Sequence, residues 1–148
     1  MSDPSTWTLP RLRIDRDGAW YHDDAEVTHA GILANLRDNL RVDDQGHHLQ
    51  IGPVRVPVQV EDTPFIVERV EAEGDGLVAT LNDLSREPLA LGSLRVDDHG
   101  IPRGRVKSGR FTARLSRAAT YQLLQFVEAG EDGPAVVLGG RRYRVAGL

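Results

Sequence analysis

Short hairpin signals recur along this chain, and they limit the folds that it can adopt. The phrase Leu-Arg-Val-Asp-Asp at 40–44 returns at 94–98, and each copy is followed two residues later by a glycine. A looser copy occupies 12–18. Asp and Gly between alternating runs are typical of tight turns, because glycine adopts the positive φ that such turns require. The sequence therefore predicts many short strands joined in hairpins.

Two segments carry the apolar spacing of amphipathic helices instead. The first covers 29–39, with Thr28 as its predicted N-cap, and the second follows the N-cap Ser116. The order hairpin, helix, hairpin thus occurs twice. We predict an α+β fold with two similar repeats, each a helix packed on a short, bent antiparallel sheet built from hairpins.

The repeats place the predicted boundaries along the chain. Residues 1–11 are expected to form a flexible N-terminal arm, 12–92 the first α+β repeat with extra strands, and 93–148 the second repeat. Within the first repeat, Pro57 interrupts the valine-rich run 54–60, which predicts an edge strand or a bulge because proline donates no ladder hydrogen bond.

Composition excludes several classes of protein. Of 148 residues, 40% are hydrophobic and 27% charged, as in ordinary globular domains. The absence of cysteine excludes disulfides, thiolate metal sites and cysteine nucleophiles. No apolar run reaches the roughly 20 residues of a membrane span, and no secretory signal is visible. We therefore expect a cytoplasmic protein that does not bind membranes.

Charge is distributed unevenly. Residues 1–98 contain nine Lys/Arg against nineteen Asp/Glu, a balance of −10, whereas 99–148 contain nine against three, a balance of +6. No acidic residue occurs between Asp98 and Glu128. Such a chain can bind an anion, or can pack its two ends against each other or against a second copy in a homodimer.

The stretch that ends the valine-rich run supplies the first candidate site residues, Glu61 and Asp62. Neighbours on a strand point to opposite faces, so these carboxylates do not form a paired acid and base. Two interpretations stay open: one carboxylate binds backbone amides or an arginine, or it lines a pocket between the repeats. Phe65 follows directly and completes this candidate region.

A second candidate region is basic. Arg103, Arg105 and Lys107 alternate, as do Arg110 and Arg114. The resulting strand face is solvated or ion-paired, or it binds an anionic small ligand or an acidic partner. Nucleic acid is a poor candidate, because the net charge is −4 and aromatic residues make up only 5%.

Motifs of metal, cofactor and catalytic chemistry are missing. His47 and His48 are adjacent, without the spacing of a zinc site. No serine lies in a Gly-x-Ser-x-Gly context, and no phosphate-loop pattern occurs. We predict no catalytic residue, metal or cofactor.

The chain resembles the bacterial domain of unknown function 1285 family over most of its length, about Leu12 to Val145. The resemblance rests on Ile-Asp-Arg-Asp-Gly-Ala-Trp-Tyr at 14–21, Val-Glu-Asp-Thr-Pro-Phe at 60–65, and Ala-Arg-Leu-Ser-Arg at 113–117 with Tyr121 and Leu123. It implies a two-repeat α+β fold without an assigned reaction, and a ligand-binding or signalling role.

Together these patterns favour a non-enzymatic small-ligand-binding or regulatory module. We expect its ligand to contact Glu61, Asp62 or Phe65 together with Arg110 or Arg114. The alternative is an enzyme with an unrecognised site near the same carboxylates and arginines.

Overall fold

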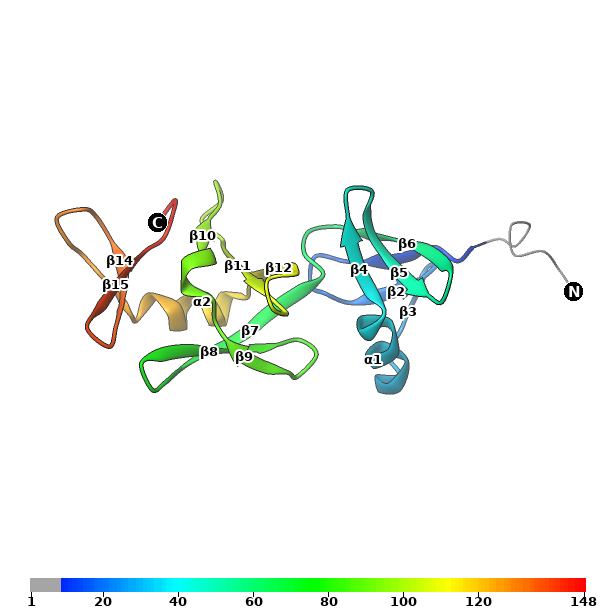
Figure 1. Ribbon diagram of the computed structural model, residues 1–148, viewed down its shortest axis with the longest axis horizontal. Helices are drawn as coiled ribbons and strands as arrows, with labels where there is room; N and C mark the ends of the chain where they lie inside the picture. Colours follow the sequence, from blue (N-terminus) through cyan, green and yellow to red (C-terminus); the bar gives the residue numbers. More distant parts are fainter. Residues whose placement is uncertain (1–8) are drawn as a thin grey trace, which may run out of the picture. The chain divides into compact units, whose positions relative to one another are not determined.

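A computed structural model describes residues 9–148 (Figure 1). The chain forms two compact units, Met1–Asp62 and Thr63–Leu148. The predicted flexible arm, residues 1–11, falls mostly outside the described residues. At its end, the backbone N–H of Arg11 donates to Asp23 Oδ1 at 3.2 Å.

The first unit contains one six-stranded sheet in the order β3-β2-β1-β6-β5-β4. Alternating apolar residues on its short strands build the core, including the fully buried Ile14, Trp20 and Leu40. The elements are β1 (Leu12–Ile14), β2 (Trp20–His22), β3 (Ala25–Glu26), α1 (Ala30–Asp38), β4 (Leu40–Asp43), β5 (Gly46–Ile51) and β6 (Val54–Val60).

The second unit contains a six-stranded sheet in the order β10-β11-β12-β7-β8-β9 and a three-stranded sheet in the order β13-β14-β15. Phe65 and Phe111 pack in its core with ring centroids 5.4 Å apart. The elements are β7 (Phe65–Glu73), β8 (Gly76–Leu81), β9 (Arg86–Pro88), the 3₁₀ turn η2 (Leu91–Ser93), β10 (Arg95–Val96), β11 (Pro102–Val106), β12 (Phe111–Leu115), α2 (Arg117–Leu124), β13 (Val127–Glu128), β14 (Ala135–Leu138) and β15 (Arg141–Arg144).

The two six-stranded sheets share one topology. In each, the strands follow the order third, second, first, sixth, fifth, fourth, and the first strand pairs parallel with the sixth: β1 with β6, and β7 with β12. The prediction of an α+β fold with repeat-like sheets is confirmed, and the fold is mostly β. The prediction of purely antiparallel sheets is wrong for this central pair, because hairpin signals are local and do not reveal how a meander closes on its own first strand.

The repeat unit differs from the predicted one. The first sheet spans 12–60 and the second spans 65–115, so neither matches the predicted ranges 12–92 and 93–148. In the second sheet η2 occupies the chain position that α1 has in the first, between the third and fourth strands. The helix α2 follows the second sheet and has no counterpart in the first.

The helices pack differently on their sheets. On α2, Ala119 and Leu123 are buried, Gln122 Oε1 accepts from the backbone N–H of Val70 at 2.7 Å, and Ser116 is the N-cap as predicted. On α1 no side chain is buried, and Ile32 is 51% exposed. A helix packed on a sheet is therefore confirmed for α2 only.

Two local predictions about the first unit are corrected. The α1 N-cap is His29, one residue after the predicted Thr28, because its Nδ1 accepts from the amides of Gly31 and Ile32. Pro57 lies on the interior strand β6 rather than at an edge. It sits where β6 stops pairing with β5 and begins to pair with β1, so the missing donor coincides with a change of partner.

No helix within residues 9–148 has the length and hydropathy needed to cross a membrane.

Candidate functional site

Glu61 is bound within the first unit. Its Oε1 accepts from Arg13 Nη1 at 2.8 Å, and its Oε2 accepts from the backbone N–H of Arg16 at 3.2 Å. Its own N–H donates to the carbonyl of Ile14 at 2.9 Å. These contacts fit the first of the two predicted interpretations, since the carboxylate holds the β1–β2 turn against the end of β6.

Asp62 and Thr63 lie on either side of the division between the units. Asp62 is half-buried and ends the first unit. Thr63 is 2% exposed; its Oγ1 donates to the carbonyl of Phe65 at 2.8 Å and accepts from the N–H of Arg114 at 3.2 Å. Thr63 thus fastens the start of β7 to β12, and it connects two of the predicted site residues, Phe65 and Arg114.

The remaining predicted residue, Arg110, is the last residue of the β11–β12 turn. Its Nε donates to the carbonyl of Lys107 at 3.0 Å, and its guanidinium lies 5.7 Å from the ring centroid of Phe111. Glu61 and Asp62 therefore belong to the first unit, whereas Phe65, Arg110 and Arg114 belong to the second. Within the second unit, Phe65 is 1% exposed and forms part of the core.

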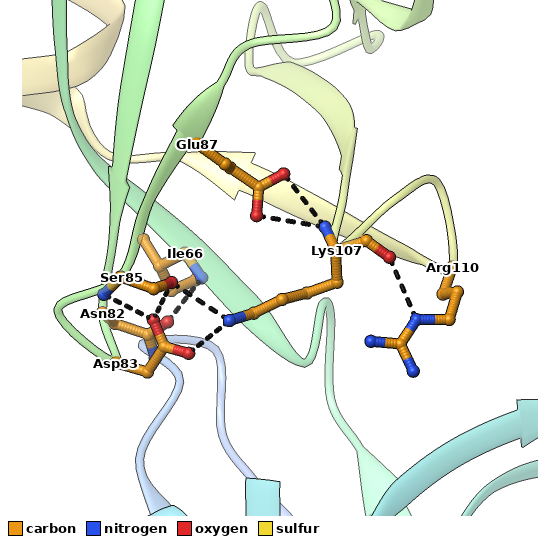
Figure 2. Close-up of polar contacts among 7 residues, drawn as sticks. All are labelled: Ile66, Asn82, Asp83, Ser85, Glu87, Lys107 and Arg110. Carbon is orange, nitrogen blue, oxygen red and sulfur yellow. Dashed lines mark hydrogen bonds and ion pairs between the residues drawn. The ribbon is translucent and has the colours of Figure 1, made fainter. Parts of the chain in front are cut away.

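Lys107 is the centre of the polar cluster in Figure 2. Its Nζ donates to Asp83 Oδ2 at 2.6 Å and to Ser85 Oγ at 3.0 Å, and lies 5.2 Å from the ring centroid of Phe65. Its backbone N–H donates to both carboxylate oxygens of Glu87 at 3.0 and 3.2 Å. These contacts join the β11–β12 turn to the β8–β9 turn.

The backbone of this turn is strained. Lys107 and Ser108 have φ of 55° and 59°, in the left-handed region that costs a residue with a side chain about 1–2 kcal/mol. The following residue, Gly109, adopts φ of 81° without that cost. The contacts of Lys107 hold the turn in this conformation.

The chemistry of the Lys107 cluster is that of a structural ion pair. Burial by itself would raise the pKa of Asp83, but the hydrogen bonds donated by Lys107 and Ser85 outweigh it and hold the pKa of this carboxyl below its ordinary value. The Ser85 hydroxyl donates to Asp83 and accepts from the Lys107 ammonium group, so its hydrogen bonds also lie within the cluster. The sequence analysis did not identify this cluster; the Asp-x-Ser spacing at 83–85, typical of an Asx turn, was the available signal.

A different group of side chains surrounds an open depression of about 180 Å³ on the second sheet. It lies where β10, β11 and β12 meet the end of η2, and its lining residues are Ser93, Arg95, Gly104, Arg105 and Thr112. Arg105 and Thr112 are directly paired across β11 and β12. Of the predicted basic strand face, Arg105 lines this depression, and Arg95 was missed.

Hydrogen bonds fix the floor of the depression. Ser93 Oγ donates to the carbonyl of Ala90 at 2.7 Å and accepts from the N–H of Arg105 at 2.9 Å. The guanidinium groups of Arg95 and Arg105 are solvent-exposed, and neither forms an ion pair with any carboxylate of residues 9–148. The nearby Arg103 differs, because it is paired with Asp97 at 3.0 Å.

The ion pair between Arg103 and Asp97 leaves the depression positively charged. The backbone amide of Ile101 and the guanidinium of Arg103 hold the pKa of Asp97 below its ordinary value, so it stays ionised and neutralises Arg103. Arg95 and Arg105 keep their charges, since a guanidinium does not deprotonate in proteins.

Comparisons with known proteins support the fold. No protein-family model matches the chain, and no curated protein matches it. A DUF1285 family protein from Silicibacter pomeroyi DSS-3 is similar in structure, with a TM-score of 0.75 and 20% identity over 95% of this chain and 85% of that chain. A DUF1285 family protein from Shewanella baltica OS155 is similar with a TM-score of 0.68 and 18% identity over 79% of this chain and 92% of that chain. These matches confirm, at the level of the fold, the resemblance predicted from the sequence.

Proposed function

We propose that this protein is a non-enzymatic binding module whose second unit takes a small anionic ligand. The observation that carries the proposal is the depression beside β10 and β11, where Arg95 and Arg105 present guanidinium groups without a carboxylate partner among the described residues. A bound anion would offset their mutual repulsion and accept charge-assisted hydrogen bonds from both. This site differs from the one predicted from the sequence, which combined the 61–65 stretch with Arg110 or Arg114.

The two arginines predicted from the sequence lie outside the depression. Arg114 is half-buried and lies on the same face of β12 as Thr112, two residues away along the strand. Arg110 is held at the turn by the carbonyl of Lys107 and the ring of Phe111.

A binding role fits the chemistry better than a catalytic one. At the Lys107 cluster the lysine and Asp83 bind each other, and Glu61 binds Arg13. A catalytic acid or base needs a proton to exchange with substrate, whereas these groups are engaged in holding turns together. The module would therefore act through occupancy of its site, as regulatory or ligand-sensing proteins do.

Thermal unfolding with added anions tests the proposal. We expect inorganic phosphate, sulfate or succinate to raise the Tm of the full chain in a concentration-dependent manner, because a ligand that binds only the folded state stabilises it. Arg105→Ala should remove most of this increase. Arg117→Ala is the matched control, since it deletes the same charge at an exposed position on α2.

Two results would overturn the proposal. One is the absence of any anion-dependent increase at low ionic strength, where electrostatic binding is strongest. The other is an equal increase in Arg105→Ala and Arg117→Ala, which would indicate a general ionic effect.

A further inference from the structure

The residues that line the depression of the second sheet have counterparts in the first sheet. Arg41 and Arg95 occupy the same place in the repeated Leu-Arg-Val-Asp-Asp phrase, and each is paired with a residue of the fifth strand, Arg41 with His48 and Arg95 with Arg103. Strand register then matches the other lining residues. Ser93, Arg95, Gly104, Arg105 and Thr112 correspond to Asn39, Arg41, Leu49, Gln50 and Arg55.

A shared hydrogen bond supports this alignment. The backbone N–H of Gln50 donates to the carbonyl of Asn39 at 3.0 Å, and the N–H of Arg105 donates to Ser93 Oγ at 2.9 Å. In both sheets the fifth strand is therefore bonded to the residue that precedes the leucine of the repeated phrase, through a backbone carbonyl in the first sheet and a hydroxyl in the second. The two places can be compared side chain by side chain.

In the first sheet the cationic groups at this place are occupied by the chain itself. Arg41 Nη1 donates to the carbonyls of Asp38 and Leu40 at 2.9 and 2.8 Å, so it caps the C-terminal end of α1. Arg55 forms a two-bond ion pair with Asp43, at 2.7 and 3.0 Å. Neither cation requires an external partner.

In the second sheet these internal contacts differ, although the acid at the position of Asp43 is retained as Asp97, which pairs with Arg103. The three-residue η2 replaces α1, and neither guanidinium contact that Arg41 makes with backbone carbonyls has a counterpart at Arg95. Thr112 stands in place of Arg55, and Arg105 in place of the uncharged Gln50. The second sheet thus has two arginines without an acidic or carbonyl partner among residues 9–148.

The strand residue beside them is also smaller. Gly104 stands in place of the buried Leu49, and a Cβ at Gly104 would lie 3.2 Å from Leu94 Cδ2 and 3.5 Å from Ser93 Oγ. A side chain here would meet the core residue Leu94, on the face of β11 opposite to Arg105, so only the backbone of Gly104 lines the depression.

We infer that the second repeat binds the phosphate group of a small phosphomonoester, with Arg95, Arg105 and the Thr112 hydroxyl as donors. The inference rests on the proposed anion-binding function and names its ligand class. Two guanidinium groups and a hydroxyl come from three different strands, which suits an anion with three terminal oxygens. A planar carboxylate has only two oxygens, and one arginine can satisfy both. The volume of about 180 Å³ leaves room for a small organic group beside the phosphate.

Isothermal titration calorimetry of the full chain at low ionic strength tests the inference, with glycerol 3-phosphate, sulfate and succinate as probes. We expect glycerol 3-phosphate to bind more tightly than succinate. Its affinity should rise between pH 5 and pH 7, because the second phosphate pKa is about 6. Sulfate should show no such rise, because it remains a dianion over this range.

Three variants locate the site. Thr112→Val should weaken glycerol 3-phosphate binding about tenfold, the effect of one hydrogen bond to a charged group. Arg105→Lys keeps the charge but loses the two-pronged geometry, and should weaken phosphate binding more than succinate binding. Arg41→Ala is the control from the first sheet and should leave the affinity unchanged.

The outcomes separate the inference from the proposed function. Succinate binding as tightly as glycerol 3-phosphate, with both lost in Arg105→Ala, would overturn the phosphate assignment and leave the anion-binding function standing. Loss of glycerol 3-phosphate binding in Arg41→Ala with retention in Thr112→Val would overturn the assignment to the second repeat. No binding of any probe would overturn both.

Discussion

Replacing Lys107 by alanine tests the account of the β11–β12 turn. The change removes the ion pair with Asp83, the hydrogen bond to Ser85 and the ammonium beside the Phe65 ring. The Asp83 carboxylate, whose side chain is 14% exposed, would lose its cationic partner. Removing one partner of a charged hydrogen bond costs about 1.5–3 kcal/mol, and the loss for a fully buried pair is larger. Because Lys107 is 22% exposed, we expect a decrease of about 2 kcal/mol in the free energy of unfolding.

Glycine at the same position distinguishes the contribution of the Lys107 side chain to stability from the cost of the backbone conformation. Lys107→Gly loses the same contacts but relieves the left-handed conformation, at φ of 55°, which costs alanine about 1 kcal/mol. It should therefore be about 1 kcal/mol more stable than Lys107→Ala. The double variant Asp83→Asn with Lys107→Ala should be no less stable than Lys107→Ala alone, since it also removes the isolated charge.

Urea unfolding followed by far-UV circular dichroism measures these differences. Circular dichroism is preferred to tryptophan fluorescence, because both tryptophans precede Asp62 and the turn belongs to the second unit. Equal stability of wild type and Lys107→Ala would refute the assignment of a structural ion pair. Equal stability of the glycine and alanine variants would refute the argument from backbone strain.

Three further predictions concern other buried or paired polar groups. Thr63→Val leaves the N–H of Arg114 and the carbonyl of Phe65 without their hydroxyl partner. It should lower the free energy of unfolding by about 1–3 kcal/mol. The control Thr80→Val, on β8, should change it little in the same urea assay. Burial, together with the neighbouring His48, lowers the pKa of His47 below its ordinary 6.5, so the folded state resists protonation of this residue. The free energy of unfolding should therefore decrease as the pH falls below about 6.5. His47→Gln should flatten this part of a curve of Tm against pH. The hydrogen bonds from Arg55 hold the pKa of Asp43 well below its ordinary value. The contribution of Asp43 to the free energy of unfolding is therefore complete above about pH 4 and is lost as the pH falls further. If Asp43→Asn lost stability with acid in the same way as the wild type, this account would be contradicted.

The fold could be predicted as far as local chemistry determines it. The repeated phrase at 40–44 and 94–98 marks equivalent hairpins, β4–β5 and β10–β11, as the internal repetition suggested. The closure of each sheet is not local, because β1 pairs with a strand 46 positions later in the chain (Leu12 with Val58). No turn signal encodes such a pairing. The helix α2 was therefore assigned to a repeat to which it does not belong.

The site could be predicted only in part, for a related reason. A strand face of arginines is visible from alternation, and Arg105 was found in this manner. Which arginine retains an unbalanced charge depends on partners far away in sequence: Arg103 meets Asp97, while Arg105 meets no carboxylate within residues 9–148. Alignment of the two copies of the repeated phrase was the signal that could have identified Arg95.

The parallel pairing of first and last strands also governs how the chain is made. During synthesis the hairpins of a repeat can form as they leave the ribosome, but β1 stays without its parallel neighbour until Val60 has emerged, and β7 until Leu115 has emerged. Contacts of this sequence separation slow folding, because the loop must close before they contribute. Each sheet should therefore complete late and in one step, and a nascent chain paused before its sixth strand would expose the edge of the first.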